Sequence, residues 1–553
     1  MEFRSLLAII LSMLVLIGFQ YLSGNLPGHP VEQAPNRSGM PPTAQTKNAG
    51  SLEGQTAQMQ RPNGTAIQQP PAGLIPKVSQ RIARDITVET DLYRMVFSER
   101  GAVLKECLLK RYSTNMKPDS PPVNLINTSQ PDLPLGIELG TSPPVDLLDQ
   151  TFDADKPGLV LTDSKKEGSL SFSYRLPNGS SVLKTYTFHQ GSYWVDLSIE
   201  VKGRPGAPVT IFMYNRPFSK ETSYVFSGPA YYAKDALTEV KLSKPGEKSN
   251  HSGPIDWIGY EDNYFLAAII PLDQYGGANA TFEKKDASGL TAISLTLPLK
   301  SDEAGDSVRL GLYYGPKEIE TLKALDHHLA DSIDFGWFTP IAKPLLYLLN
   351  FLYSYFHNYG IAIIIITLLI KIAFWPLAHK SAKSMKTMQK LQPKLAKLKE
   401  KYANDKEALN RELMQLYKTY KVNPMSGCLP MLLQIPVFFA LYKVLLQAIE
   451  LRHAPFALWI KDLSAPDRLM IPGVVIPILG GIPVLTLFMG ASMYLQQKMT
   501  PSSLDPTQAK MMQILPVVFT FMFINFPSGL VLYWLVNNLF SIVQQYYINK
   551  FTE

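Results

Sequence analysis

Residues 360–376, GIAIIIITLLIKIAFWP, form an apolar run that contains a single charged residue, Lys371. Its length and composition predict a transmembrane helix, because the hydrocarbon core of a bilayer is about 30 Å thick. A charged side chain near the centre of such a helix costs at least about 2.5–3.5 kcal/mol. Thr367 lies four residues earlier and shares the helical face of Lys371. We therefore look to the rest of the chain for a polar environment around that face.

The residues alone leave two interpretations of Lys371 open. Its side chain could bend towards the cytoplasmic interface, which we place near Trp375 to Lys380. At about 1.5 Å per residue that interface is about 8–13 Å away, which is a strained reach for a lysine stem. Alternatively, the charge faces a hydrated cavity within the membrane.

A polar stripe on the last predicted span favours the hydrated cavity. Tyr533, Asn537 and Ser541 recur at intervals of four residues, and Gln544 continues the same face. Isolated polar residues in a span often form hydrogen bonds between helices, each worth roughly 0.6 kcal/mol. A whole stripe, with a lysine on another helix, is more typical of a wet groove. The candidate groove residues are Lys371, Thr367, Gln434, Tyr533, Trp534, Asn537 and Ser541.

The first 335 residues contain three different kinds of sequence. Residues 1–22 are apolar after Arg4 and predict a transmembrane signal anchor with a cytoplasmic N-terminus. A cleaved signal is the alternative, although no A-x-A-like site follows. Residues 23–80 are rich in Pro, Gly and Gln and predict a flexible tether. Residues 81–335 alternate in short runs between turn residues, which predicts a large antiparallel β-sandwich beyond the membrane. Its clearest predicted strands are 85–89, 93–98, 170–174, 193–201, 209–213 and 289–297.

Residues 336–358 predict an amphipathic helix in the outer interface. Its apolar stripe consists of Leu345, Leu348, Leu349, Leu352 and Phe356.

Charge assigns the remaining segments to the two sides of the membrane. Between Lys380 and Lys421 there are twelve basic and four acidic residues, with leucines spaced as in a helical hairpin. By the positive-inside rule this hairpin is cytoplasmic. The loop 450–480 has three residues of each sign, which suits the outer side. The predicted order is a second span (359–378), the hairpin (379–424), a third span (425–449), the outer loop (450–480), a fourth span (481–497), a cytoplasmic loop (498–510), a fifth span (511–526), a sixth span (528–548) and a short cytoplasmic tail (549–553).

Composition excludes several classes of protein. The chain has 553 residues, a net charge of +7 and two cysteines, Cys107 and Cys428, which this topology places on opposite sides of the membrane. They cannot pair in a disulfide bond. We find no metal-ligand cluster, phosphate-binding glycine loop or nucleophile motif, and His189 and His251 are isolated. We expect no catalytic residues, no metal, no cofactor and no enzymatic activity.

The last 200 residues or so resemble the YidC-type membrane protein insertases of Gram-negative bacteria, in the YidC/Oxa/Alb insertase family. The blocks that carry the resemblance are Leu391–Lys394, Leu416–Lys418, Val422–Pro424, Gly427–Pro430 with Gln434–Pro436, Ala440–Tyr442, Ala454–Ile460 and Phe526–Trp534. The resemblance implies an α-helical polytopic membrane protein, with an N-terminal anchor, a five-helix bundle that carries a cytoplasmic helical hairpin, and a large periplasmic antiparallel β-sandwich. It also implies a hydrophilic groove that is closed on the outer side.

Three features depart from the family pattern. Lys371 stands where the family has an arginine, so the charge is kept but the forked donor geometry is lost. Trp534 stands where many members have a second tyrosine. Only five residues follow Ile548, so we expect ribosome contacts to involve the hairpin and the loop 498–510.

The resemblance implies insertion and chaperoning of new membrane proteins, alone or with the Sec translocon, in the bacterial inner membrane. Both termini would be cytoplasmic and the large domain periplasmic. Expected partners are nascent membrane-protein clients, ribosomes or targeting factors at the hairpin, the Sec translocon and membrane lipids; we expect no DNA binding. The excess charge of the hairpin also suits RNA. The alternative function is a small-solute or ion transporter with a periplasmic receptor domain, against which the absence of an internal repeat argues.

Overall fold

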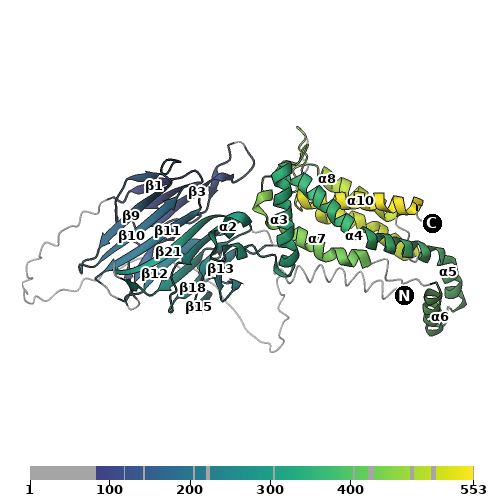
Figure 1. Ribbon diagram of the computed structural model, residues 1–553, viewed down its shortest axis with the longest axis horizontal. Helices are drawn as coiled ribbons and strands as arrows, with labels where there is room; N and C mark the ends of the chain where they lie inside the picture. Colours follow the sequence, from purple (N-terminus) through teal and green to yellow (C-terminus); the bar gives the residue numbers. More distant parts are fainter. Residues whose placement is uncertain are drawn as a thin grey trace, which may run out of the picture.

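The computed structural model describes residues 82–117, 119–140, 143–203, 206–218, 225–302, 305–402, 405–420, 429–473, 479–499 and 506–551. The predicted anchor 1–22 and tether 23–80 lie outside the described residues, as does Cys428. The described chain has a β-rich region and a helical region, which lie at opposite ends of the molecule (Figure 1).

The strands of the β-rich region follow the predicted pattern of short apolar runs between turns. Strands β1 and β2 begin and end at the predicted residues, and four more predicted strands overlap β9, β11, β12 and β19, with ends that differ by up to three residues. The strands are β1 (Asp85–Glu89), β2 (Tyr93–Ser98), β3 (Val103–Ser113), β4 (Pro122–Asn124), β5 (Ile137–Leu139), β6 (Val145–Asp146), β7 (Asp153–Ala154), β8 (Gly158–Val160), β9 (Glu167–Arg175), β10 (Ser181–His189), β11 (Trp194–Lys202), β12 (Val209–Asn215), β13 (Gly228–Ala233), β14 (Ala236–Glu239), β15 (Lys248–Ser252), β16 (Trp257–Glu261), β17 (Phe265–Pro271), β18 (Asn279–Lys284), β19 (Thr291–Leu297), β20 (Lys300–Asp302) and β21 (Gly305–Pro316).

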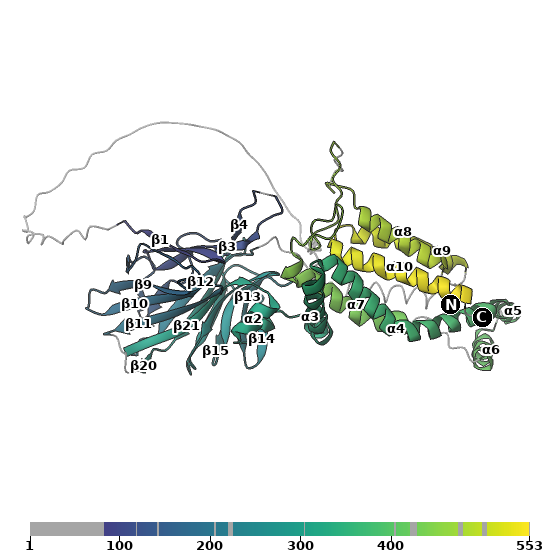
Figure 2. The same cartoon turned by 45° about the horizontal axis from the view of Figure 1, so that its top comes forward.

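The strands form three sheets. A ten-stranded sheet runs β14-β13-β16-β17-β21-β11-β10-β9-β7, with β20 paired to β21. A five-stranded sheet runs β4-β3-β2-β1-β8, and a six-stranded sheet runs β15-β18-β19-β12-β5-β6. All strand pairs are antiparallel except β1 with β8, which is parallel and so departs from the predicted antiparallel arrangement. In Figure 2 the sheet of β1 and β3 lies over the long strands β9, β10 and β11.

The core of the β-rich region lies between these layers. Phe97 on β2 contacts Phe172 on β9 and both Tyr186 and Phe188 on β10, with ring centroids 4.8–6.0 Å apart. Lys184, also on β10, is fully buried, and its Nζ donates to the carbonyl oxygens of Ala102 (2.7 Å) and Leu135 (2.5 Å). Both of those residues have positive φ angles. The lysine therefore ties together two backbone turns, and the hydroxyl of Tyr186 also donates to the carbonyl of Ala102, at 3.2 Å.

The helices of the second region range from apolar ones such as α4 and α7 to the charged helices α5 and α6. They are α2 (Ile319–Leu325), η1 (Leu329–Ser332), η2 (Gly336–Phe338), α3 (Thr339–Phe356), α4 (Tyr359–Lys390), α5 (Gln392–Lys401), α6 (Lys406–Thr419), α7 (Leu429–Gln447), η4 (Ile449–Leu451), α8 (Val484–Met499), α9 (Pro506–Phe523) and α10 (Ser528–Phe551). Among the described residues, α4 alone is long and apolar enough to cross a membrane; shorter apolar stretches are Leu432–Gln447 and Gln513–Phe523.

Two helices differ from the predicted pattern. Helix α4 continues past Pro376 to Lys390, so the second predicted span and the start of the hairpin are one helix. The apolar face of α3 is buried at Ala342, Leu346, Leu349 and Leu352. Phe356, predicted on that face, is 49% exposed. The contacts of α3 with both α4 and α7 select the observed face.

The hairpin has a small core of its own. Met388 and Leu391 are buried there, against Leu395 on α5 and Tyr417 on α6. Asp405 begins α6 by accepting hydrogen bonds from the backbone N–H groups of Glu407 and Ala408. The hairpin lies at the end of the helical region farthest from the sheets (Figure 1).

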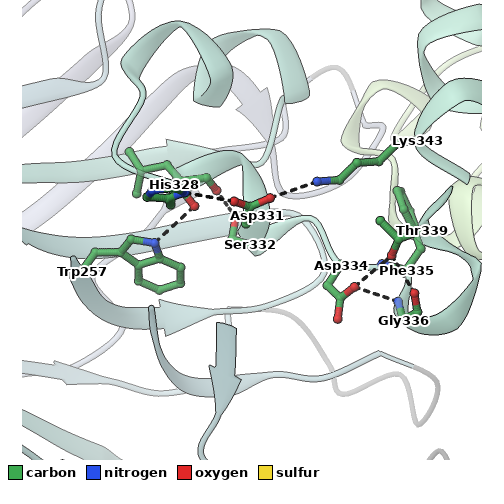
Figure 3. A network of polar contacts seen from close by, with 10 residues as sticks. Trp257, His328, Asp331, Ser332, Asp334, Phe335, Gly336, Thr339 and Lys343 are labelled. Atoms are coloured by element: carbon green, nitrogen blue, oxygen red, sulfur yellow. Dashed lines mark hydrogen bonds and ion pairs between the residues drawn. The ribbon is translucent and has the colours of Figure 1, made fainter. Parts of the chain in front are cut away.

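Several polar contacts join the β-rich region to the helices. Asp331 in η1 forms an ion pair with Lys343 on α3 at 3.1 Å, and Trp257 on β16 donates to the carbonyl of His328 (Figure 3). Asn263 donates to the carbonyl of Leu446 near the end of α7. Arg452 donates to the carbonyl of Ser113 on β3. These contacts place the end of α7 against the β-rich region.

Glu450 lies in this junction. Its Oε1 accepts a hydrogen bond from Nδ2 of Asn350 on α3 at 3.3 Å. Burial is the main cause that raises the pKa of Glu450 to about 6, and the nearby Glu318 raises it further. Oε2 of Glu450 and Oδ1 of Asn350 are both buried without a partner among the described residues. A proton on Oε2 would supply Oδ1 with a donor and complete a paired acid–amide contact between α3 and the end of α7.

We predict that this junction is more stable at pH 5 than at pH 7.5. The folded-state pKa of Glu450 is raised, so its stabilisation is complete below about 4.5 and is lost as the pH rises through about 6. The change is at most about 2 kcal/mol, because one pKa unit corresponds to about 1.4 kcal/mol. Hydrogen exchange of α3 and the end of α7, corrected for intrinsic rates, measures it. Glu450→Gln keeps the shape without the titration, so an unchanged pH dependence in that variant would contradict the prediction.

Candidate functional site

Lys371 is held between two helices. It lies on α4 with 9% of its surface exposed, and its Nζ donates to Oγ of Ser541 on α10 at 2.8 Å. Ser541 in turn donates to the carbonyl of Asn537 at 2.8 Å. Among the described residues no carboxylate forms an ion pair with Lys371. The structure thus brings Lys371 together with the predicted polar face of α10.

Thr367 shares the face of Lys371 but is satisfied within its own helix. Its Oγ1 donates to the carbonyl of Ile363 at 2.7 Å, and the residue is 1% exposed. Threonine commonly bonds the preceding helical turn in this way. Its hydroxyl hydrogen is therefore committed, and the residue contributes a small polar surface beside Lys371 rather than a free donor.

Tyr533 and Trp534 lie in an aromatic cluster. Tyr533 is 5% exposed and stacks on Phe438 of α7 with ring centroids 6.2 Å apart. Trp534 contacts the same phenylalanine at 4.7 Å and Phe523 of α9 at 4.6 Å. Phe519, Phe526 and Tyr442 extend the cluster. This cluster joins α7, α9 and α10, and Tyr533 lies two helical turns from Ser541 on α10.

Gln434 and Asn537 are half-buried. Gln434 lies four residues before Phe438 on α7 and therefore on the same helical face as the aromatic cluster. Asn537 lies four residues after Tyr533 and four before Ser541. The predicted residues thus divide between a charged part at Lys371, Asn537 and Ser541 and an aromatic part at Tyr533 and Trp534.

Two polar features were not among the predicted site residues. Asn538 is buried and donates to Oγ of Ser492 on α8 at 3.0 Å. Gln544 is 8% exposed, and its Nε2 has no partner among the described residues. Gln544 follows Ser541 by three residues and lies on its face. Its place in the polar stripe was a signal for it, whereas Ser492 lies on α8, where no stripe of polar residues pointed to it.

The start of α4 is fixed against the loop that follows α7. Asn358 caps the helix by accepting from the N–H of Ile361, and its Nδ2 donates to the carbonyl of Phe456. A Cβ added at Gly360 would lie 2.0 Å from Cδ2 of Phe456. Glycine at this position therefore allows α4 to approach the loop, and the approach sets the position of Lys371 along α10.

The site presents polar groups and one positive charge. The ammonium group of Lys371 offers a positive charge. The nearby hydroxyl and amide side chains offer hydrogen bonds, all within an apolar helical environment. Among the described residues there is no group of three or more His, Cys, Asp or Glu side chains that could hold a metal ion. A β-rich domain joined to apolar helices, with the buried ammonium of Lys371 among those helices, is typical of an integral membrane protein.

Comparisons with known proteins agree with this class. A family model described as the 60Kd inner membrane protein matches residues 351–553, and one described as the YidC periplasmic domain matches residues 85–348. The chain is 44% identical to the membrane protein insertase YidC of Syntrophus aciditrophicus (strain SB) over 561 residues, covering 100% of both chains. It is 44% identical over 567 residues to that of Syntrophobacter fumaroxidans, again over 100% of both.

A crystal structure of an active YidC insertase with its first transmembrane domain resolved aligns with 86% of this chain and 94% of its own. The sequence identity is 20% and the TM-score 0.37, so the assignment depends on the sequence matches. The chain belongs to the YidC family of membrane protein insertases. It is an integral inner-membrane protein with a β-rich periplasmic domain, and insertases are not enzymes. The resemblance seen in the sequence is confirmed.

We predict a measurable coupling between Lys371 and Ser541. Removing either partner of a charged hydrogen bond in an apolar setting should destabilise the contact between α4 and α10 by about 1 kcal/mol. A double-mutant cycle with Lys371→Met and Ser541→Ala, measured by unfolding in bicelles, tests this. The matched control cycle pairs Lys371→Met with Thr367→Val, whose hydroxyl bonds its own helix and should give no coupling. Equal coupling in both cycles would show that the Ser541 contact is not specific.

Proposed function

We propose that this chain inserts membrane proteins by receiving their polar segments in a hydrophilic groove. Lys371, Thr367, Gln434, Asn537 and Ser541 would form the polar wall of the groove, and Tyr533 and Trp534 its aromatic end. The observation that supports this most directly is the Lys371 ammonium, which meets the polar face of α10 through a hydroxyl instead of a carboxylate. Its charge is therefore left for a partner outside the bundle.

The physical advantage of such a groove is reduced desolvation. A polar client segment that crosses bare hydrocarbon loses its water, at a free-energy cost of roughly 2–7 kcal/mol for each unpaired polar group. A groove lined with hydroxyl, amide and ammonium groups replaces part of that water. The apolar segment of the client meanwhile moves into the surrounding lipid. Lys371 attracts acidic client segments as a point charge and needs no forked geometry.

The proposed topology places six spans in the inner membrane, with both termini in the cytoplasm. The basic hairpin of α5 and α6 would face the cytoplasm and dock ribosomes or targeting factors, as the positive-inside rule favours. Lys394 on α5 lies over the ring of Tyr420, 4.6 Å from its centroid, which fixes the two arms of the hairpin beside each other. The periplasmic domain would contact the Sec translocon, and lipid headgroups would meet the basic surface.

We predict that Lys371→Met impairs clients according to their charge. Insertion of a client with an acidic translocated tail should fall roughly fivefold, equivalent to about 1 kcal/mol of lost attraction. A client with the same span and a neutral tail should be much less affected. Insertion into proteoliposomes, measured by protease protection of the tail, provides the comparison. Lys371→Arg keeps the charge and serves as the matched control. If Lys371→Met inserted both tails equally well, electrostatic attraction would be the wrong explanation.

A second prediction concerns the face of α10 that meets the client. A photocrosslinking residue at Asn537 should capture stalled nascent clients several times more often than one at Leu539, which is 48% exposed on another face. The two positions lie two residues apart, so they point about 200° apart around the helix. Equal capture at both positions would argue against a groove on this face. A chain that transported small solutes instead would capture clients at neither.

A further inference from the structure

The loop after α7 carries two adjacent residues of opposite charge, Asp467 and Arg468, whose side chains bind helix ends. Asp467 is 3% exposed. Its Oδ2 accepts hydrogen bonds from the backbone N–H groups of Leu485 (2.5 Å) and Thr486 (3.3 Å), in the first turn of α8. Its Oδ1 accepts from Nε1 of Trp459 at 2.6 Å. The residue before α8 is Pro483, which has no side-chain acceptor, so Asp467 supplies the cap from a distance.

Arg468 binds the end of the neighbouring helix. Its Nη1 donates to the carbonyl of Ile524, the residue after α9 ends, at 2.8 Å. Its Nη2 donates to Oδ1 of Asn525 at 2.9 Å, and its Nε to the carbonyl of Leu479 at 2.9 Å. The last carbonyls of a helix lack intrahelical donors and carry partial negative charge. A guanidinium group at this position donates hydrogen bonds to those carbonyls and places a positive charge beside their partial negative charge.

The charges therefore match the helix termini. The N-terminus of α8 is partly positive and receives a carboxylate, and the C-terminus of α9 is partly negative and receives a guanidinium. Among the ion pairs of the described residues, neither Asp467 nor Arg468 is paired with an opposite charge. Both are directed to the helices, and α8 packs on α9 where Gly490 meets Thr520.

The same loop also holds the start of α10. The N–H of Ser528 donates to the carbonyl of Ala465 at 2.7 Å, and that of Gly529 to the carbonyl of Leu463 at 2.9 Å. Leu469 and Ile482 exchange two backbone hydrogen bonds and close the loop on itself. The loop contacts the β-rich region through Arg452. It therefore lies at the periplasmic end of the bundle.

We infer that Asp467 and Arg468 are positioning residues for insertion, because they hold the periplasmic ends of α8 and α9 together and so seal that end of the bundle. A hydrated site inside a membrane protein needs such a seal, or water would connect the two sides. The polar groups at the helix ends would attract that water if the loop did not satisfy them. This inference rests on the proposed function, since the seal matters only if the interior accepts polar segments.

The test measures access from the periplasmic side. The full chain receives a single cysteine at Leu532, which is 4% exposed beneath the loop, after both native cysteines are replaced by alanine. Labelling with a membrane-impermeant maleimide is followed in right-side-out vesicles. Arg468→Ala and Asp467→Ala should each raise the labelling rate by about tenfold, because local opening of the helix ends becomes more frequent. The increase should occur only when the reagent is on the periplasmic side.

Matched variants distinguish a loss of the seal from a general loss of folded structure. Lys461→Ala removes an exposed cation from the same loop and should leave labelling unchanged. Asp467→Asn keeps one acceptor oxygen and should recover part of the wild-type protection. Hydrogen exchange in β10 and β11 should remain at the wild-type level in every variant. Unchanged labelling in both alanine variants would overturn the seal.

Client insertion by the same vesicles completes the test. Insertion should fall in the variants whose labelling rises. If labelling rose while insertion stayed at the wild-type level, the two residues would have no positioning role in insertion, and the proposed function would stand. Failure of the wild-type chain to insert the client would instead reject the proposed function, while the labelling rates still decide whether the seal exists.

Discussion

The ammonium group of Lys371 has to be kept charged or solvated inside an apolar helix, and the arrangement of the helical region follows from this requirement. Among the described residues, its hydrogen-bond acceptor is the hydroxyl of Ser541. That contact requires α4 and α10 to keep a fixed relative position. Gly360 supports the position by allowing α4 to lie close to Phe456. A polar face on α10 then becomes the natural surroundings of the charge.

Polar caps at one end and aromatic packing between the helices hold the bundle together. At the periplasmic end, the backbone groups of α8, α9 and α10 are satisfied by one loop, through Asp467, Arg468 and main-chain contacts. An aromatic cluster around Trp534 fills the space between α7, α9 and α10. Polar capping and aromatic packing therefore reinforce each other, since the caps fix helix ends and the rings fill the gaps between helices.

Much of the architecture could be predicted from local pattern. Strands β1 and β2 were predicted to the residue because alternation and turn residues set both ends. The polar stripe predicted on α10 includes Ser541, which the structure places beside Lys371. Other features depend on distant partners. Tyr533 is packed by Phe438, 95 positions away in the chain, so its aromatic surroundings could not be seen in its own helix. Likewise, the balanced charges of the outer loop suggested its side of the membrane but not that Asp467 and Arg468 bind helix ends. The helix also continued through Pro376, because a proline that removes one hydrogen bond need not end a long apolar helix.

The hairpin of α5 and α6 is packed independently of the rest of the helical region. Its core of Met388, Leu391, Leu395 and Tyr417 is separate from the large core that the sheets share with the other helices. A substitution within this small core therefore changes the packing of the hairpin and not that of the large core. A change in the sequence or length of the hairpin can therefore be accommodated without repacking the framework around Lys371.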